Sequence, residues 1–271
     1  MTEGTFRLTA EPRLEKPSLI VGWTQDAGRL GAGVINYLNA KIKGESFCQI
    51  EAAEFFALNS IAVENDVAQF PASTFYHGTP NNLALFKADE PQLQKNHFLN
   101  AILDVAEHYC KVEQIYTVNG IVSSIAHTSP RRILAVFNQP QIQKQLRSYN
   151  LENMTWQGRP HLSTYLLWLA KNRDIPAAGL WVEVPFYLAT CRDFQSLKTV
   201  ADFFVRKITP DLSIEDLDEK IDRQNLMLSQ LRRENSEVDR SIAELESGLS
   251  LNEEQQMQLI KITNDLLQDN V

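Results

Sequence analysis

The sequence predicts an α/β domain followed by a C-terminal helical extension. Through the first 210 of its 271 residues, apolar runs of strand length alternate with segments of helical period. This alternation is the pattern of a mainly parallel or mixed sheet with helices packed on it. After residue 210 the strand signals stop and one long helical repeat begins. We expect two domains, an α/β domain over residues 1–210 and an acidic, coiled-coil-like extension over residues 211–271.

The elements of the α/β domain follow from this alternation, taken in chain order. Apolar runs bounded by turn residues predict strands over Ser18–Trp23, Phe47–Ile50, Leu83–Phe86, Gln114–Val118, Ile133–Phe137 and Gly179–Val184. Helical periodicity predicts helices over Gly31–Ile42, Gln94–Cys110, Gln141–Ser148, Leu162–Lys171 and Phe194–Lys207. Between Ile61 and Phe75 the signals are mixed, and we expect a short strand or a hairpin there.

The extension starts where Pro210 ends the last helix of the α/β domain. Ser213 and Asp216, three residues apart, resemble a capping box for a new helix. Heptad positions a and d then run through Ile214, Leu217, Ile221, Gln224, Leu228, Leu231, Asn235, Val238, Ile242, Leu245 and Leu249. This repeat predicts one helix of about 50 Å that Gly248 ends. A second helix follows Ser250, so we expect a helical hairpin.

Two interpretations of this seam stay open. Leu226 and Met227 widen the apolar face, which favours packing of the hairpin against its own domain. An asparagine at an a position, here Asn235, is typical of a true coiled coil, where it fixes register and strand number. In that case the seam would form an interaction surface made up of Ile214, Leu217, Ile221, Leu228, Leu231, Asn235, Val238, Ile242 and Leu245. We expect a homo-oligomer and predict a trimer.

The formal net charge of −8 is concentrated in the extension. Residues 211–271 hold 15 Asp and Glu against 6 Lys and Arg, a net of −9, which leaves residues 1–210 at about +1. An acidic segment repels nucleic acid, and the rest of the sequence has no basic stripe with interleaved aromatics. We therefore expect a protein partner and no nucleic acid.

Cysteine usage and hydropathy indicate the compartment. Cys48, Cys110 and Cys191 are far apart and never form a CxxC pair, so neither a disulfide framework nor a zinc site is indicated. The N-terminal segment is polar without an apolar h-region, and no run of about 18 apolar residues follows. We expect a cytoplasmic protein with no membrane association.

Two loops could bind a small ligand. Gly28, Gly31 and Gly33 lie where the first strand gives way to a helix, a place where backbone N–H groups can cradle a phosphate. Their spacing is GxxGxG, not the GxGxxG of dinucleotide folds, and glycines at this junction also serve tight turns and close helix packing.

The second loop reads SSIAHTSPRR and contains His127, Thr128 and Arg131. Imidazole, hydroxyl and guanidinium groups could together receive an anion at the end of a strand, where open α/β sheets usually bind ligands. The alternative is that these groups hydrogen-bond the loop itself and cap the adjacent elements.

Other signatures of chemistry are absent from the sequence. It contains no GxxxxGK[ST], GxSxG or HExxH motif and no pair of histidines at i, i+4 spacing. We therefore assign no catalytic residue, no metal ligand and no cofactor.

Several blocks of the sequence resemble the proteasome assembly chaperone family, in particular its prokaryotic branch. They are PSLIVGW at residues 17–23, ADEPQ at 88–92, VNGIVSSIAHTSPRR at 118–132 and the long block ending in VPFYLA at 153–189. The resemblance implies a three-layer αβα sandwich similar to purine nucleoside phosphorylases and related hydrolases, with no established enzymatic activity. It also implies a homo-oligomer that handles other proteins, as some members do for proteasome α subunits.

Two functional hypotheses follow. The first is a non-enzymatic protein-interaction or assembly chaperone-like protein of unassigned client. The alternative is an enzyme or sensor of a small phosphorylated or nucleoside ligand, bound at the glycine loop and the His127 loop.

Overall fold

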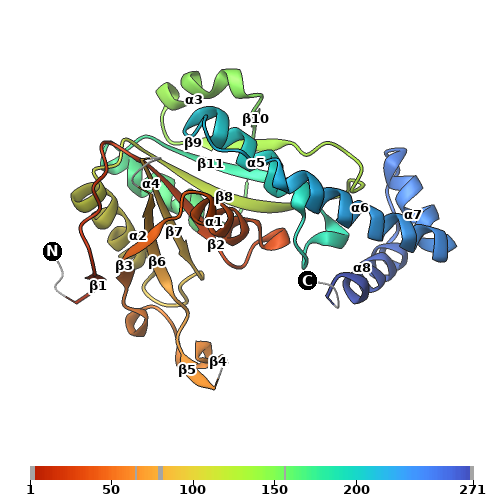
Figure 1. Ribbon diagram of the computed structural model, residues 1–271, viewed down its shortest axis with the longest axis horizontal. Helices are drawn as coiled ribbons and strands as arrows, with labels where there is room; N and C mark the ends of the chain where they lie inside the picture. Colours follow the sequence, from red (N-terminus) through yellow and green to blue (C-terminus); the bar gives the residue numbers. More distant parts are fainter. Residues whose placement is uncertain (1–3, 65, 79–81, 156, 269–271) are drawn as a thin grey trace. The chain divides into compact units, whose positions relative to one another are not determined.

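The computed structural model describes residues 4–268 except 65, 79–81 and 156, and it confirms the predicted α/β class (Figure 1). The large sheet has the strand order β1-β3-β6-β7-β2-β8-β11-β9-β10. Its strands are β1 (Phe6–Leu8), β2 (Ser18–Trp23), β3 (Glu45–Ile50), β6 (Ser73–Gly78), β7 (Leu83–Ala88), β8 (Gln114–Ser123), β9 (Ile133–Phe137), β10 (Glu152–Asn153) and β11 (Ala177–Pro185). A separate hairpin is formed by β4 (Ala62–Glu64) and β5 (Val67–Gln69).

The helices of the α/β part match the predicted positions, and further helices follow in the C-terminal part. They are α1 (Leu30–Lys41), α2 (Lys95–Asp104), α3 (Pro140–Leu146), α4 (Leu162–Asn172), α5 (Phe194–Lys207), α6 (Asp216–Glu234), α7 (Ser236–Glu246) and α8 (Glu253–Gln268). The predicted helix over Gln94–Cys110 is α2 followed by a π-helical segment over Val105–Cys110.

The sheet is mixed, as predicted. β2 pairs in parallel with both β7 and β8, whereas β1, β3, β6 and β7 pair antiparallel at one edge. β6 interrupts the expected succession of parallel strands, because it joins β3 and β7 as an antiparallel neighbour of each.

Contacts divide the chain into two compact units. The first comprises residues 1–25, 31–118 and 135–180, and the second comprises 26–30, 119–134 and 181–271. This partition differs from the predicted division at residue 210. The two domains expected over residues 1–210 and 211–271 remain a prediction.

The first unit is layered about its strands. Side chains alternate across β2, so Leu19, Val21 and Trp23 share one face and pack in a core with residues of α2 and α4. Gly22 points to the opposite face, where α1 approaches so closely that an added Cβ would lie 2.7 Å from Cγ1 of Ile35. Helices therefore cover both faces of the sheet, as a three-layer fold requires.

The C-terminal helices differ from the prediction. The expected continuous helix of about 50 Å is wrong, because α6 ends at Glu234 and Asn235 adopts an extended conformation (φ −135°, ψ 105°). The Asn235 side chain then accepts hydrogen bonds from the backbone N–H groups of Glu237 (3.0 Å) and Val238 (3.2 Å), which makes it the N-cap of α7. Three helices stand where a two-helix hairpin was expected.

Candidate functional site

The His127 loop (residues 124–132) is held against the short 3₁₀ turn η7 (Phe186–Leu188) in the second unit. The Tyr187 hydroxyl accepts from the backbone N–H of His127 at 2.6 Å and lies 2.9 Å from its Nδ1. Because the hydroxyl oxygen accepts from the N–H, its own proton is free to be donated to Nδ1 of a neutral imidazole. The side chain predicted to receive an anion is thus a buried acceptor, 6% exposed.

Burial and nearby guanidinium groups keep this imidazole neutral. The pKa of His127 is lowered to about 4, first by burial and then by the charge of Arg232, with a smaller contribution from Arg131. Glu246 and Asp193 act in the opposite direction and do not outweigh them. Burial likewise raises the pKa of Tyr187 above its usual value.

Arg131 is also turned inward. Its guanidinium donates to Asp193 (Nε–Oδ2 2.8 Å) and to the carbonyl oxygens of Ala126, His127 and Ser129. The Arg131 and Asp193 side chains are 0% and 1% exposed. Asp193 in turn accepts from the backbone N–H of Gln195 at 3.1 Å as the N-cap of α5. This buried pair holds the loop to the start of α5 and leaves Arg131 unavailable to a ligand.

Thr128 connects the loop to the C-terminal helices. Its hydroxyl donates to Glu246 of α7 at 2.9 Å, and Glu246 receives Arg232 of α6 in a bidentate pair (2.8 and 3.1 Å). Hydrogen bonds from Arg232 are the main reason that the pKa of Glu246 is lowered. The loop and α7 are therefore linked by charge-assisted hydrogen bonds.

Sequence reasoning missed Glu183, a buried carboxylate on β11 that is 3% exposed. It accepts from Arg132 (Nε 2.8 Å, Nη2 2.6 Å) and from the Ser123 hydroxyl (2.9 Å). Burial alone would raise the pKa of Glu183, but these hydrogen bonds outweigh burial and lower it. No spacing rule could link Glu183 to Ser123, because the two are 60 positions apart.

The glycine loop (residues 26–33) is not arranged as a phosphate cradle. The N–H of Gly28, in the left-handed region at φ +70°, donates to the carbonyl oxygen of Ala189 at 2.7 Å. The Asp26 carboxylate in the same turn accepts from the N–H of Gly120 at 2.6 Å and adds negative charge. Gly28 is thus required by a tight turn, the alternative that the sequence left open.

Gly31 and Gly33 lie on α1 and belong to the first unit, whereas Gly28 belongs to the second. An added Cβ on Gly31 would come within 2.8 Å of the backbone N and O of Trp23, so this glycine permits close packing of α1 on the sheet. The structure brings Gly28, His127 and Arg131 together around residues 184–193 and directs Thr128 to Glu246, so the polar groups of all four bond to the protein itself.

The predicted interaction seam contributes to the core of the second unit. Leu217, Ile221, Leu228, Val238, Ile242 and Leu245 are buried, and Ile214, Leu231 and Asn235 are partly buried. Val238, Ile242 and Leu245 pack in one cluster with Phe186 and Leu188 of η7. This packing accounts for the apolar periodicity, and a role of the seam between chains remains a prediction.

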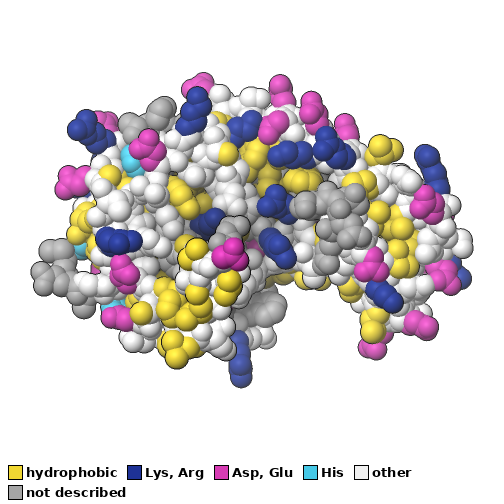
Figure 2. Space-filling view, turned by 60° about the horizontal axis from the view of Figure 1, so that its bottom comes forward, with side chains coloured by type: hydrophobic (Ala, Val, Ile, Leu, Met, Phe, Trp, Pro, Cys, Tyr) yellow, Lys and Arg dark blue, Asp and Glu magenta, His cyan; other side chains and the backbone are white. Residues whose placement is uncertain are grey.

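Apolar side chains instead reach solvent near the β4–β5 hairpin, which projects from the sheet in Figure 1. The exposed fractions are 80% for Leu58, 72% for Val63 and 58% for Val67. In Figure 2, which turns the lower side of Figure 1 toward the viewer, hydrophobic side chains gather in the lower left of the view. The sequence indicated a hairpin here but not its exposure.

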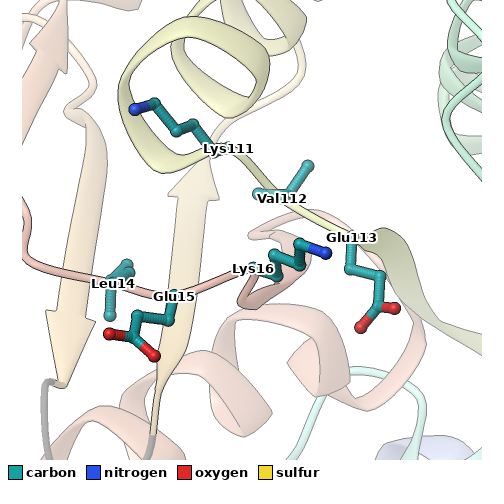
Figure 3. A pocket seen from close by; sticks show the side chains of 6 residues that line it. All are labelled: Leu14, Glu15, Lys16, Lys111, Val112 and Glu113. Atoms are coloured by element: carbon teal, nitrogen blue, oxygen red, sulfur yellow. The ribbon is translucent and has the colours of Figure 1, made fainter.

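The first unit contains an open depression and two buried thiols. An open depression of about 710 Å³ is lined by Leu14, Glu15, Lys16, Lys111, Val112 and Glu113. The ammonium groups of Lys16 and Lys111 point apart in it, so the depression does not focus charge (Figure 3). Burial raises the pKa of Cys48 and Cys110 to about 12, so neither thiol is a ready nucleophile.

The described residues lack a metal-binding cluster and a membrane-spanning helix. No group of three or more His, Cys, Asp or Glu side chains there could hold a metal ion. Within the same residues, no helix combines the length and apolar character needed to cross a bilayer.

Comparisons with known proteins agree on one family and fold. A family model described as PAC2 family matches residues 19–232. The structure is similar to the Mycobacterium tuberculosis protein of unknown function Rv2714 (TM-score 0.78, 20% identity, 92% of this chain and 91% of that one). It is also similar to Pyrococcus furiosus PbaB, an archaeal proteasome activator (0.70, 17%, 84% and 98%). A third similar structure is the M. tuberculosis proteasome-assembly chaperone homologue Rv2125 (0.71, 16%, 83% and 99%). The comparison with curated proteins gives no match.

Proposed function

The chain belongs to the PAC2 family, and from this premise we propose that it is a chaperone-like protein that binds another protein and catalyses no reaction. The similar structures described as a proteasome activator and a proteasome-assembly chaperone homologue support a role in handling proteins. We assign the partner by class only, as a protein with an apolar binding surface.

The observation that carries this proposal is the exposed β4–β5 hairpin. Val63 pairs with Ala68 across the hairpin, while Val67 pairs with the next position of β4, so the two valines lie on opposite faces of the ribbon. Both are more than half exposed. A two-stranded ribbon that buries neither face is marginally stable in water, so a partner that covers it would stabilise it. Burial of exposed apolar side chains favours protein association, so a partner that covers both faces of the ribbon would gain from both valines.

The inward-facing polar groups support the non-enzymatic part of the proposal. Arg131 and the N–H of Gly28 already bond to the protein itself. The alternative hypothesis, a small phosphorylated or nucleoside ligand at these two loops, would need both groups to turn outward.

We also propose that the protein works as a homo-oligomer in the cytoplasm. The family resemblance supports oligomerisation, and the trimer remains our specific prediction. The three cysteines are free and buried, which supports a reducing compartment.

An affinity pull-down from the native host tests the proposal. The bait is the full chain, and a second bait carries Leu58→Ser, Val63→Thr and Val67→Thr, at exposed positions where little stability is lost. We expect a near-stoichiometric protein on the unaltered chain and its loss on the hairpin variant, as identified by mass spectrometry.

The matched control exchanges exposed apolar residues elsewhere, Leu226→Gln on α6 and Met257→Gln on α8, which are 66% and 70% exposed. The control should keep the partner. Absence of any stoichiometric protein on the unaltered chain would argue against the proposed function. Equal loss on both variants would argue against the hairpin as the binding surface.

A further inference from the structure

A second, smaller pocket lies in the second unit, between the turn after η7, the middle of α6 and the end of α8. Its volume is about 240 Å³. Three cationic side chains line it, Arg192, Lys220 and Arg223, together with the apolar side chains of Phe194, Met227 and Leu267. The pocket therefore combines positive charge with apolar walls.

Hydrogen bonds fix the pocket's shape. The buried amide of Gln224 donates to the carbonyl oxygen of Arg192 at 2.7 Å and accepts from the N–H of Phe194 at 3.2 Å. Asn264 of α8 accepts from the Thr190 hydroxyl at 2.6 Å, which ties the same turn to α8. These bonds connect the turn to both helices, so the backbone around the pocket is held in place.

Within the described residues, the three cations share a lack of ion-paired carboxylates. In the part of the chain that the structure describes, no carboxylate forms an ion pair with Arg192, Lys220 or Arg223, although acidic residues predominate after residue 210. Lys198 and Arg232, by contrast, pair with neighbouring carboxylates. Lys220 instead lies 5.9 Å from the ring centroid of Phe194. Three positive groups around one pocket lack a counter-charge.

We propose that this pocket binds a small organic anion, a carboxylate or phosphate joined to a short apolar body. The guanidinium groups of Arg192 and Arg223 suit planar or tetrahedral oxyanions, and Lys220 adds a third charge. Phe194, Met227 and Leu267 would cover the apolar body. Pockets for drug-sized ligands measure about 300–1,000 Å³, so the ligand is smaller than these. None of the residues of the glycine loop or the His127 loop takes part.

Isothermal titration of the full chain tests this assignment with two anionic probes, phenyl phosphate and benzoate, and with benzamide as a neutral relative of benzoate. We expect saturable binding of at least one anion and binding at least about tenfold weaker for benzamide, because charge-assisted hydrogen bonds are roughly twice as strong as neutral ones. Preference between the two anions identifies phosphate or carboxylate as the recognised group.

Variants connect the binding to the pocket. Arg223→Gln and Lys220→Gln should each weaken the better anion about fivefold to tenfold, since each removes one charged donor. Arg233→Gln is the matched control, because Arg233 is an exposed cation on the same helix and does not line the pocket. All three positions are exposed, so unchanged unfolding midpoints are expected.

Three results would overturn the assignment. The first is no saturable binding of either anion, and the second is equal weakening by Arg233→Gln, which would indicate diffuse attraction. The third is binding of inorganic phosphate as tight as that of phenyl phosphate, which would remove the role of the apolar walls.

Discussion

The guanidinium of Arg131 and the imidazole of His127 illustrate how far residue types reveal a site. Both were found from the sequence because hydroxyl and cationic residues cluster in SSIAHTSPRR. Their partners Tyr187 and Asp193 lie about 60 positions further along the chain, and no local pattern connects them. The sequence therefore predicts a polar loop but not whether its polar groups face solvent or the protein.

At the residue scale, His127 should make stability depend on pH. Its pKa is about 4 in the folded chain and about 6.5 in the unfolded one. Below pH 6.5 the unfolded chain therefore binds a proton that the folded chain rejects, so stability is lost as pH falls from about 6.5 to about 4. The loss should reach about 3 kcal/mol, measured by urea unfolding at a series of pH values.

The variant His127→Asn isolates this contribution, because asparagine retains an oxygen acceptor near the position of Nδ1 but does not titrate. Between pH 7 and pH 4 it should lose about 3 kcal/mol less than the unaltered chain. His108→Asn, at an exposed position, serves as the control and should follow the unaltered chain. Parallel pH curves for His127→Asn and the unaltered chain would contradict the assignment.

At the scale of elements, the strands that the sequence identified contain runs of apolar residues, and most of the predicted positions are buried. β2 and β9 have the predicted bounds, and β2 is buried at every position. β6 was missed because its sequence STFYHG mixes polar and aromatic residues, and its burial depends on pairing with β3 and β7. Whether such a segment forms a strand depends on pairing with segments that are distant in the sequence.

Asn235 shows how one residue type fits two structures. A heptad and a helix break both accept asparagine, but they predict opposite effects of replacing it. As the N-cap of α7, Asn235→Leu should lower the free energy of unfolding by about 1 kcal/mol, because two helix N–H groups lose their acceptor. At a coiled-coil a position, leucine would instead stabilise the helix pair. Urea unfolding distinguishes the two.

The control for this prediction is Asn225→Leu, in the middle of α6. Leucine has the higher helix propensity, so this variant should keep or slightly raise stability. Equal or greater stability of Asn235→Leu relative to the unaltered chain would restore the coiled-coil interpretation.

At the scale of the whole molecule, the sequence located the apolar seam but not what covers it. Apolar periodicity predicts that one face of a helix is buried, but the surface that covers this face can belong to the same chain or to another. Here Ile242 and Leu259, on different C-terminal helices, pack in one cluster with Phe186 and Leu188. A seam that is used inside the chain leaves less apolar surface for contact between chains.

A variant that ends at Pro210 therefore tests whether the C-terminal helices are needed for the fold of the second unit. It removes Val238, Ile242, Leu245 and Leu259 from a cluster in which each is at most 4% exposed. At roughly 1.5–3 kcal/mol for each fully buried aliphatic side chain, the loss is comparable to the 5–15 kcal/mol that stabilises a typical domain.

We expect this variant to bind a hydrophobic dye and to unfold at a much lower temperature than the full chain, because the apolar residues of η7 become exposed. The control Leu226→Gln, which alters the exposed face of α6, should leave both readings unchanged. If residues 211–271 were an independent extension, the shortened chain would instead keep its unfolding temperature and bind no dye. Dye fluorescence during a thermal ramp therefore shows whether residues 211–271 are an integral part of the second unit or an independent extension.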